Sequence, residues 1–229
     1  MTEPDISGTH ALERLFDLPR EARDAGWLDS FYETVKTAAI EVCDTQAIEG
    51  PDGFPYLNTR MPRPGEFEAH SIEELAEACT DQGVGVVLNA HGQPPSWVFY
   101  YGQLWSLRAY GGFTGDGLGD SGEPAEGIDE LPAGAELMLG APAPSLLPDF
   151  ARPVLRSYLQ HVGVQDPAVV LMIDSRYPKT RNLVFNLYAE DFESGEDFED
   201  AMQTLAWFLP PGLATIAIPK GALDIPHEL

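Results

Sequence analysis

The chain has 229 residues, 44% of them hydrophobic, and 37 acidic side chains against 13 basic ones give a formal net charge of −24. A chain of this length buries enough apolar surface to fold without a metal or a disulfide. The charge repels phosphate backbones and anionic lipids, which excludes nucleic acid and membranes as expected partners and favours a basic, Arg/Lys-rich protein.

The sequence carries no targeting signal that we can identify. Its first residues, MTEPDISGTH, have neither a basic start nor an apolar run, and no stretch approaches the roughly 18 apolar residues of a membrane-spanning helix. We therefore expect a cytoplasmic protein. Cys43 and Cys79 stand outside any Cys-x-x-Cys motif, which predicts two reduced thiols in that compartment.

Two helices are predicted near the start of the chain. Apolar residues recur at helical spacing from Leu12 to Leu18, and Pro19 interrupts them. The segment 27–42 predicts a longer amphipathic helix, whose apolar face consists of Leu28, Phe31, Val35, Ala38 and Val42. The Gly- and Pro-rich segment 44–64 predicts turns, with one short strand through 54–58.

A capping box gives the clearest local signal in the sequence. Ser71 is followed three residues later by Glu74, and Gly83 supplies a left-handed stop, which predicts a helix from about Ser71 to Gln82. An apolar strand is expected over 84–90, followed by a turn that contains Pro94 and Pro95.

An aromatic segment, WVFYYGQLWSLRAYG, follows this turn and is predicted to be a second, longer strand. Alternation places one set of residues on an apolar core face, namely Trp97, Phe99, Tyr101, Trp105 and Leu107. The other face mixes aromatic and polar groups. The segment 111–135 is rich in Gly, Asp, Glu and Pro, which predicts a flexible acidic loop at the domain boundary.

The second half of the chain is predicted to repeat the order of the first. Helix, strand, Pro-containing turn and strand occur in both halves, about 80 residues apart, although without residue-level identity. The expected elements of the second half are a strand at 136–140, a helix at 150–161, strands at 168–174 and 183–189, a helix at 192–209 and a strand at 214–218.

The region 141–219 resembles the C-terminal domain of the SseB-like (enhanced serine sensitivity) family. The segments that carry the resemblance are APAPSLLPDF, QHVG, VVLMID, NLVFNLYAEDFE and LPPGLATIAIP. The resemblance implies an α+β lobe over 136–229. It transfers no catalytic or binding residue, because these segments match in hydrophobic order and contain no catalytic signature.

The sequence offers no clear catalytic, metal or cofactor motif. Gly117, Gly119 and Gly122 match the letters of a dinucleotide fingerprint, but Pro124 stands where a helix should open, and Asp116 and Asp120 would repel a pyrophosphate. The five His residues are scattered singly, and no Gly-x-Ser-x-Gly elbow occurs. We therefore predict no cofactor, no metal site and no catalytic residue.

The aromatic segment is the most distinctive remaining feature. Tyr, Trp and Arg dominate binding hot spots, because they combine a large area with a polar tip. These rings also fit an ordinary core. If they form a site, the expected binding residues are Tyr100, Arg108 and Tyr110 on the mixed face of the strand, with Arg60 as a neighbour.

Together these patterns predict an α+β fold with two helix-on-antiparallel-sheet lobes, 1–110 and 136–229, which either stand apart or share one sheet. The predicted function is a non-enzymatic bacterial cytoplasmic protein-interaction module. The alternative is a hydrolase or small-molecule-binding protein with a site in the cleft between the lobes.

Overall fold

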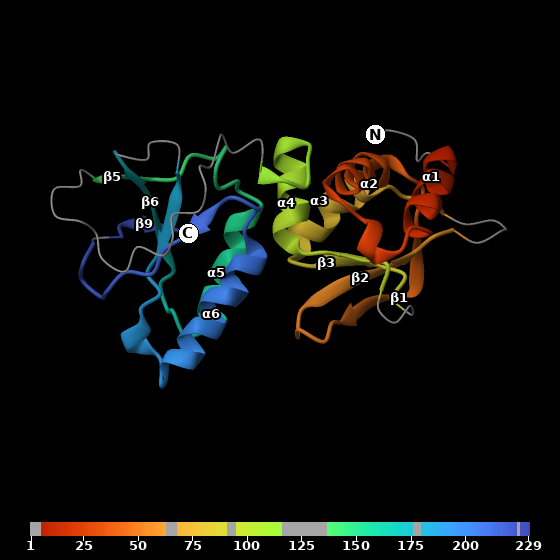
Figure 1. Ribbon diagram of the computed structural model, residues 1–229. Helices are drawn as coiled ribbons and strands as arrows, with labels where there is room; N and C mark the ends of the chain where they lie inside the picture. Colours follow the sequence, from red (N-terminus) through yellow and green to blue (C-terminus); the bar gives the residue numbers. More distant parts are fainter. Residues whose placement is uncertain (1–5, 63–67, 91–94, 116–136, 176–179, 224) are drawn as a thin grey trace. The chain divides into compact units, whose positions relative to one another are not determined.

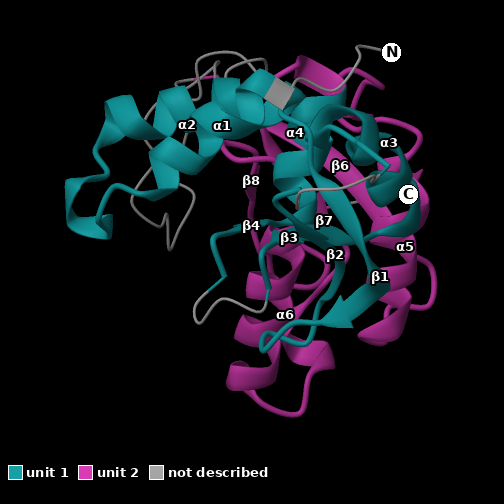
Figure 2. Cartoon of the chain, turned by 90° about the vertical axis from the view of Figure 1, so that its right-hand side faces the viewer, with its two compact units in different colours: residues 1–108 teal, residues 109–229 magenta. Residues whose placement is uncertain are grey.

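A computed structural model of the chain (Figure 1) describes residues 6–62, 68–90, 95–115, 137–175, 180–223 and 225–229. The chain divides into two compact units, Met1–Arg108 and Ala109–Leu229 (Figure 2). The described strands form two sheets, and each sheet belongs to one unit. The predicted α+β class with two lobes is therefore confirmed, whereas the described strands do not form the alternative single shared sheet.

Unit 1 contains a mixed sheet in the order β1-β2-β3-β4. Strand β2 pairs antiparallel with β1 and parallel with β3, and β3 pairs antiparallel with β4. The elements of this unit are α1 (Ile6–Phe16), η1 (Arg20–Ala22), α2 (Ala25–Thr37), β1 (Glu41–Glu49), β2 (Pro55–Arg60), α3 (Ile72–Gln82), β3 (Gly85–Leu88), β4 (Trp97–Phe99) and α4 (Tyr101–Tyr110), whose last two residues belong to unit 2.

Unit 2 contains a mixed sheet in the order β5-β6-β7-β8, and β9 also pairs with β6. Its strands are antiparallel except for the parallel pair β7 and β8. The elements of this unit are β5 (Leu137–Gly140), α5 (Ala151–His161), β6 (Ala168–Asp174), β7 (Asn182–Phe185), η3 (Ala189–Asp191), α6 (Gly195–Phe208), β8 (Ala214–Thr215) and β9 (His227–Glu228).

The prediction of purely antiparallel sheets is wrong at one strand pair in each unit. Helix α3 connects β2 to the parallel β3, and α6 connects β7 to the parallel β8. Parallel neighbours need a crossover connection, which a helix supplies. The repeated order of helix and two antiparallel strands is confirmed, as α3-β3-β4 and α5-β6-β7.

The prediction of one long strand over 97–111 is also wrong. Only Trp97–Phe99 is a strand, and Tyr101–Tyr110 is the helix α4. All residues of α4 from Tyr101 to Leu107 are buried. A helix buried around its whole circumference has no polar stripe, so its sequence lacks the 3.6-residue period that would distinguish it from a buried strand.

The helix predicted over 27–42 ends earlier, at Thr37, and β1 begins at Glu41. Contacts distant in sequence account for this end. Ile40 and His70 exchange backbone hydrogen bonds of 2.8 and 3.0 Å, and the Thr9 hydroxyl donates to the Ala39 carbonyl at 2.8 Å. These bonds hold residues 39–40 in an extended conformation. No Gly or Pro near them in the sequence indicates the end of the helix.

The capping box at α3 is confirmed. The Ser71 hydroxyl accepts from the Glu74 backbone N–H at 3.1 Å, and the Glu74 carboxylate accepts from the Ser71 N–H at 3.2 Å. Gly83 ends the helix with φ +73°. The local sequence alone therefore sets both ends of α3.

Asn89 fixes the exit from β3 toward β4. Its backbone adopts φ +55°, a left-handed conformation that Asn tolerates better than most residues. Its side-chain oxygen accepts from the Met61 N–H at 3.0 Å, and its Nδ2 donates to the Ser96 hydroxyl at 2.9 Å. One side chain thus joins the end of β2 to the start of β4.

The sheet of unit 2 is covered on both faces at β7, because all four residues of this strand, which alternate between the faces, are buried. Leu155 and Leu159 of α5 and Leu205 of α6 are completely buried. A second cluster contains Val170, Met172, Val184 and Ile218, and residues from the segment 216–225 pack against it. Of the predicted flexible loop, 116–135 lies outside the described residues, and in its first part Phe113 is buried.

Part of the core of unit 1 is an aromatic cluster around Phe31. Its ring stacks on Trp27 at a centroid distance of 5.2 Å and lies 4.5 Å from Trp97 and 6.0 Å from Phe99. Phe31 has no exposed surface. These ring contacts attach α2 to β4.

Replacement of Phe31 by Ala should destabilise the protein by about 3–5 kcal/mol, because it removes buried area and leaves a cavity among three rings. Urea unfolding followed by circular dichroism measures the change. The control is Glu33→Ala on the exposed side of the same helix, expected within about 0.5 kcal/mol of the parent. A loss below about 1 kcal/mol for Phe31→Ala would contradict the described packing.

Candidate binding site

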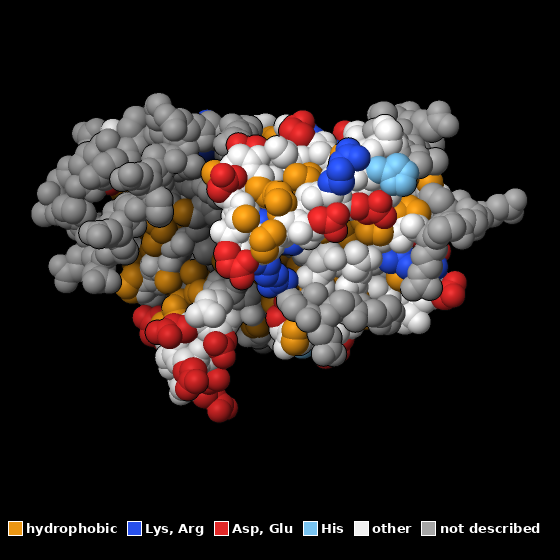
Figure 3. Space-filling model, turned by 45° about the vertical axis from the view of Figure 1, so that its right-hand side comes forward, with side chains coloured by type: hydrophobic (Ala, Val, Ile, Leu, Met, Phe, Trp, Pro, Cys, Tyr) orange, Lys and Arg blue, Asp and Glu red, His pale blue; other side chains and the backbone are white. Residues whose placement is uncertain are grey.

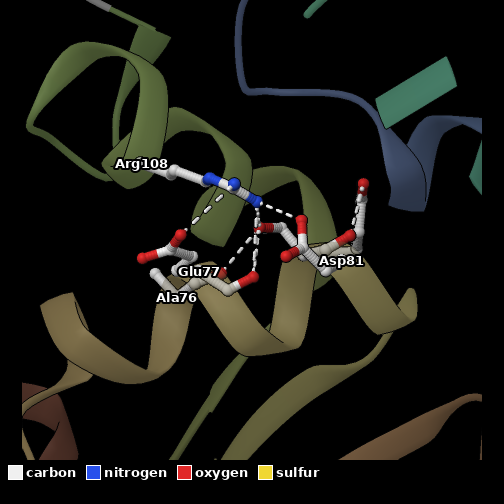
Figure 4. A network of polar contacts seen from close by, with 6 residues as sticks. Ala76, Glu77, Asp81 and Arg108 are labelled. Carbon is white, nitrogen blue, oxygen red and sulfur yellow. Dashed lines mark hydrogen bonds and ion pairs between the residues drawn. The ribbon is translucent and has the colours of Figure 1, made fainter. Parts of the chain in front are cut away.

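Arg108, a predicted binding residue, attaches α4 to α3 (Figure 4). Its Nη1 donates to the Asp81 carboxylate at 2.6 Å, the Thr80 hydroxyl at 2.8 Å and the Glu77 carbonyl at 3.3 Å. The Glu77 carboxylate lies 3.9 Å from Nη2. These contacts lie within unit 1 and engage the Arg108 guanidinium in holding α4 against α3.

The coupling between Arg108 and Asp81 should be about 0.5–1 kcal/mol, because the pair is partly exposed and screened by solvent. A double-mutant cycle of Arg108→Ala and Asp81→Ala, followed by urea unfolding, measures it. The same cycle with Glu33 and Lys36, an i, i+3 pair within one helix, gives the reference for a local ion pair. If the unfolding free-energy changes of Arg108→Ala and Asp81→Ala are strictly additive, the interaction between the two side chains is contradicted.

The other predicted residues have separate contacts. Arg60 is bound by the Glu41 carboxylate through both Nε and Nη2, across the β1–β2 pair. The Tyr110 hydroxyl donates to the Ser145 carbonyl at 2.9 Å within unit 2. Tyr100 is half-buried, and burial, followed by the nearby Tyr32, raises its pKa to about 12.

The mixed strand face predicted for Tyr100, Arg108 and Tyr110 does not exist. Tyr100 precedes α4, and Arg108 and Tyr110 lie on that helix, where successive side chains turn by about 100° instead of alternating. The prediction of a shared face is therefore wrong, because it depended on a strand.

An open groove lies elsewhere in unit 1, between 20–28 and 95–98. It encloses about 670 Å³, a volume in the range of ligand-binding sites. Its lining includes Trp27, Trp97, Arg20 and Arg23, and we call it the Trp/Arg groove. Val98, with 38% of its surface exposed, contributes a further apolar side chain.

The aromatic wall of the groove is fixed from the start of α2. The Asp24 carboxylate caps the helix by accepting from the Trp27 backbone N–H at 2.8 Å, and the indole N–H of Trp27 donates to the Leu15 carbonyl at 2.9 Å. The Trp27 and Trp97 rings lie 5.8 Å apart. Cap, indole bond and ring contact together hold Trp27 in one position.

The guanidinium of Arg23 lies over the Trp27 ring, 4.8 Å from its centroid. Its Nε donates to the Leu18 carbonyl and its Nη2 to the Phe16 carbonyl, each at 3.1 Å. Arg20 donates from Nη2 to the Pro95 carbonyl at 3.5 Å, across the groove. Carbonyl partners carry no net charge, so they do not offset the positive charge of either guanidinium group.

Neither Arg20 nor Arg23 forms an ion pair with a carboxylate of the described residues. By contrast, Lys36, Arg60, Arg108, Arg152 and Lys220 each have an acidic partner within 4.0 Å. Asp24 also lines the groove, and its carboxylate keeps its negative charge while it caps α2. With two arginines against one aspartate, the lining of the Trp/Arg groove is net positive on an acidic chain.

A second hollow in unit 1, of about 430 Å³, contains Cys79 and His70 in its lining. Burial raises the pKa of the Cys79 thiol to about 12, so the thiol keeps its proton near neutral pH. Glu41, also in the lining, is engaged by Arg60. This hollow therefore holds no activated cysteine nucleophile.

Both cysteines should resist thiol reagents in the folded protein. A pKa of about 12 leaves roughly one Cys79 thiol in 10⁴ ionised at pH 8, and Cys43 is buried as well. Ellman's reagent should titrate neither thiol in native buffer and both in denaturant. A thiol that reacts equally fast in both conditions would contradict this burial.

Two further findings concern the described part of the chain. No three His, Cys, Asp or Glu side chains among the described residues are grouped so that they could hold a metal ion. None of the described helices combines the length and the apolar character needed to cross a membrane.

The Trp/Arg groove was not predicted from the sequence. A local signal was present, because Arg20 and Arg23 stand one helical turn apart just before Trp27. Trp97 was predicted to lie on a core face, yet the residue is only partly buried. The contact between 20–28 and 95–98 spans about 70 residues of sequence, which no local pattern indicates.

Comparisons of the chain with protein-family models, with curated proteins and with solved structures give no match. They neither support nor contradict the resemblance of 141–219 to the SseB-like family.

Proposed function

We propose that the protein is a non-enzymatic bacterial cytoplasmic protein-interaction module and that the Trp/Arg groove is its docking surface. The observation that carries this proposal is the meeting of the half-buried Trp97, the exposed Val98 and two Arg groups in one open groove. Trp and Arg are the side chains most enriched where binding energy is concentrated.

The rigidity of the groove supports the proposal. Trp27 is held by the cap of α2 and by its indole bond to Leu15, and Arg23 is held by two carbonyls and the Trp27 ring. Side chains that are already fixed lose little conformational entropy when a partner binds. Val98 adds exposed apolar surface that a partner would cover.

The charge distribution of unit 2 favours a partner that is basic overall. Glu196 and Asp197 lie in the first turn of α6, after the η3 residues Glu190 and Asp191. Figure 3 shows acidic side chains gathered at that end of the unit. Such a surface attracts basic proteins over long range at low salt.

We also propose that unit 2 is related to the C-terminal domain of SseB-like proteins. The support is the order of its elements over 141–219, in which a Pro-rich lead is followed by α5, β6, β7, the acidic helix α6 and β8. This order is the one that the resembling segments imply.

Filling the Trp/Arg groove should abolish partner binding without unfolding the protein. Ala25 is exposed at the first position of α2 and lines the groove, so Ala25→Trp places an indole in the groove. The control is Ala206→Trp, at an exposed position of α6 in unit 2. Parent and both variants are immobilised, and retained lysate proteins are identified by mass spectrometry.

We expect at least one protein to be retained by the parent and by Ala206→Trp but lost with Ala25→Trp, while all three melt at similar temperatures. Identical protein sets on the three columns would refute the groove as the docking surface. Absence of any partner at every salt concentration, together with turnover of a small substrate, would overturn the interaction function itself.

A further inference from the structure

We infer that the segment entering the Trp/Arg groove is an acidic, apolar-rich stretch of the partner chain, with a carboxylate at Arg20 and Arg23 and an apolar side chain against Trp97 and Val98. This inference rests on the proposed docking function. It adds the chemistry of the occupant, which differs from the overall charge expected of the partner.

Charge complementarity is the first argument. The chain carries 37 acidic residues, yet no carboxylate of the described residues pairs with Arg20 or Arg23. Two guanidinium groups without an acidic partner, against the single carboxylate of Asp24 in the lining, favour an anionic occupant. A planar guanidinium matches a carboxylate through two parallel hydrogen bonds.

The remaining hydrogen-bonding capacity of the two arginines is the second argument. A guanidinium has five N–H donors. Arg23 uses donors on two nitrogens for carbonyls, and Arg20 makes one long bond of 3.5 Å to Pro95. Donors therefore remain for an incoming acceptor, and the long Arg20 bond is the weakest and easiest to exchange.

The apolar walls define the other half of the occupant. The apolar part of the lining consists mainly of Val98 and the half-buried Trp97 and Leu28, because Trp27 is only 6% exposed. Apolar surface of this kind binds aromatic or aliphatic side chains, since their burial removes area from water on both partners. A segment with only acidic side chains would leave this apolar lining exposed to water.

The net charge of the chain does not prevent this binding. At physiological ionic strength the Debye length is about 8 Å, so carboxylates that lie farther than this from the groove are largely screened. Arg20 and Arg23 would lie in direct contact with the occupant and act within that length. Local charge thus decides which segment enters, and net charge acts at longer range.

A phage-displayed library of random linear peptides tests the inference. It is selected on the parent protein and, in parallel, on Arg20→Glu, Arg20→Gln, Ala25→Trp and the matched control Arg156→Glu. Arg156 is exposed on α5 in unit 2, so its reversal changes the net charge equally. Melting temperatures of all variants establish that each is folded.

We expect the parent to enrich peptides that combine Asp or Glu with Trp, Phe or Leu. Synthetic copies of these peptides should bind Arg20→Glu about tenfold more weakly or worse, Arg20→Gln at an intermediate level and Arg156→Glu as they bind the parent. Substitution of the acidic residue of the peptide by its amide should reduce the loss caused by Arg20→Glu.

Two other outcomes count against the inference and separate it from the proposed function. The first outcome is a set of peptides that lose binding to Ala25→Trp and so need the open groove, but that are neutral or basic or bind Arg20→Glu as well as the parent. It would overturn the acidic occupant and leave the proposed docking surface unaffected. Absence of any peptide that distinguishes the parent from Ala25→Trp would overturn both.

Discussion

The ring contacts among Trp27, Phe31 and Trp97 are the interaction on which unit 1 depends. It joins α2 to β4, two elements far apart in the sequence, and buries Phe31 completely. Because two of the three rings also line the Trp/Arg groove, the same contact supports the fold and forms the candidate site. Stability and binding are therefore difficult to vary independently here, and the binding variants proposed above leave these rings intact.

Elements whose signals are local could be predicted from the sequence. Helix α3 is bounded by the Ser71–Glu74 capping box and Gly83, and strand β6 by its apolar run over Ala168–Asp174. Helix α4 could not, because burial of all its residues from Tyr101 to Leu107 removes the polar stripe that identifies a helix. Strand β1 was missed for a different reason, since distant partners of Ile40 end α2.

The candidate site was less predictable than the fold, because its geometry is tertiary. Arg108 and Arg60 were reasonable choices by residue type, but both are engaged by acids within unit 1. What distinguishes Arg20 and Arg23 is that their partners are carbonyls and a ring instead of carboxylates. Composition cannot distinguish an arginine that is paired with a carboxylate from one that is not, because the pairing depends on tertiary contacts.

Asn89 gives the groove an unusual chemical dependence. Three demands meet at this residue: a left-handed backbone, an acceptor for Met61 and a donor to Ser96, which itself lines the groove. Glycine would satisfy only the backbone. Aspartate would keep the acceptor but lose the amide donor. Asparagine meets all three demands. Slow hydrolysis of its side-chain amide to a carboxylate would remove the hydrogen bond to Ser96 and loosen the wall of the groove, although Asn89 is not itself among the lining residues.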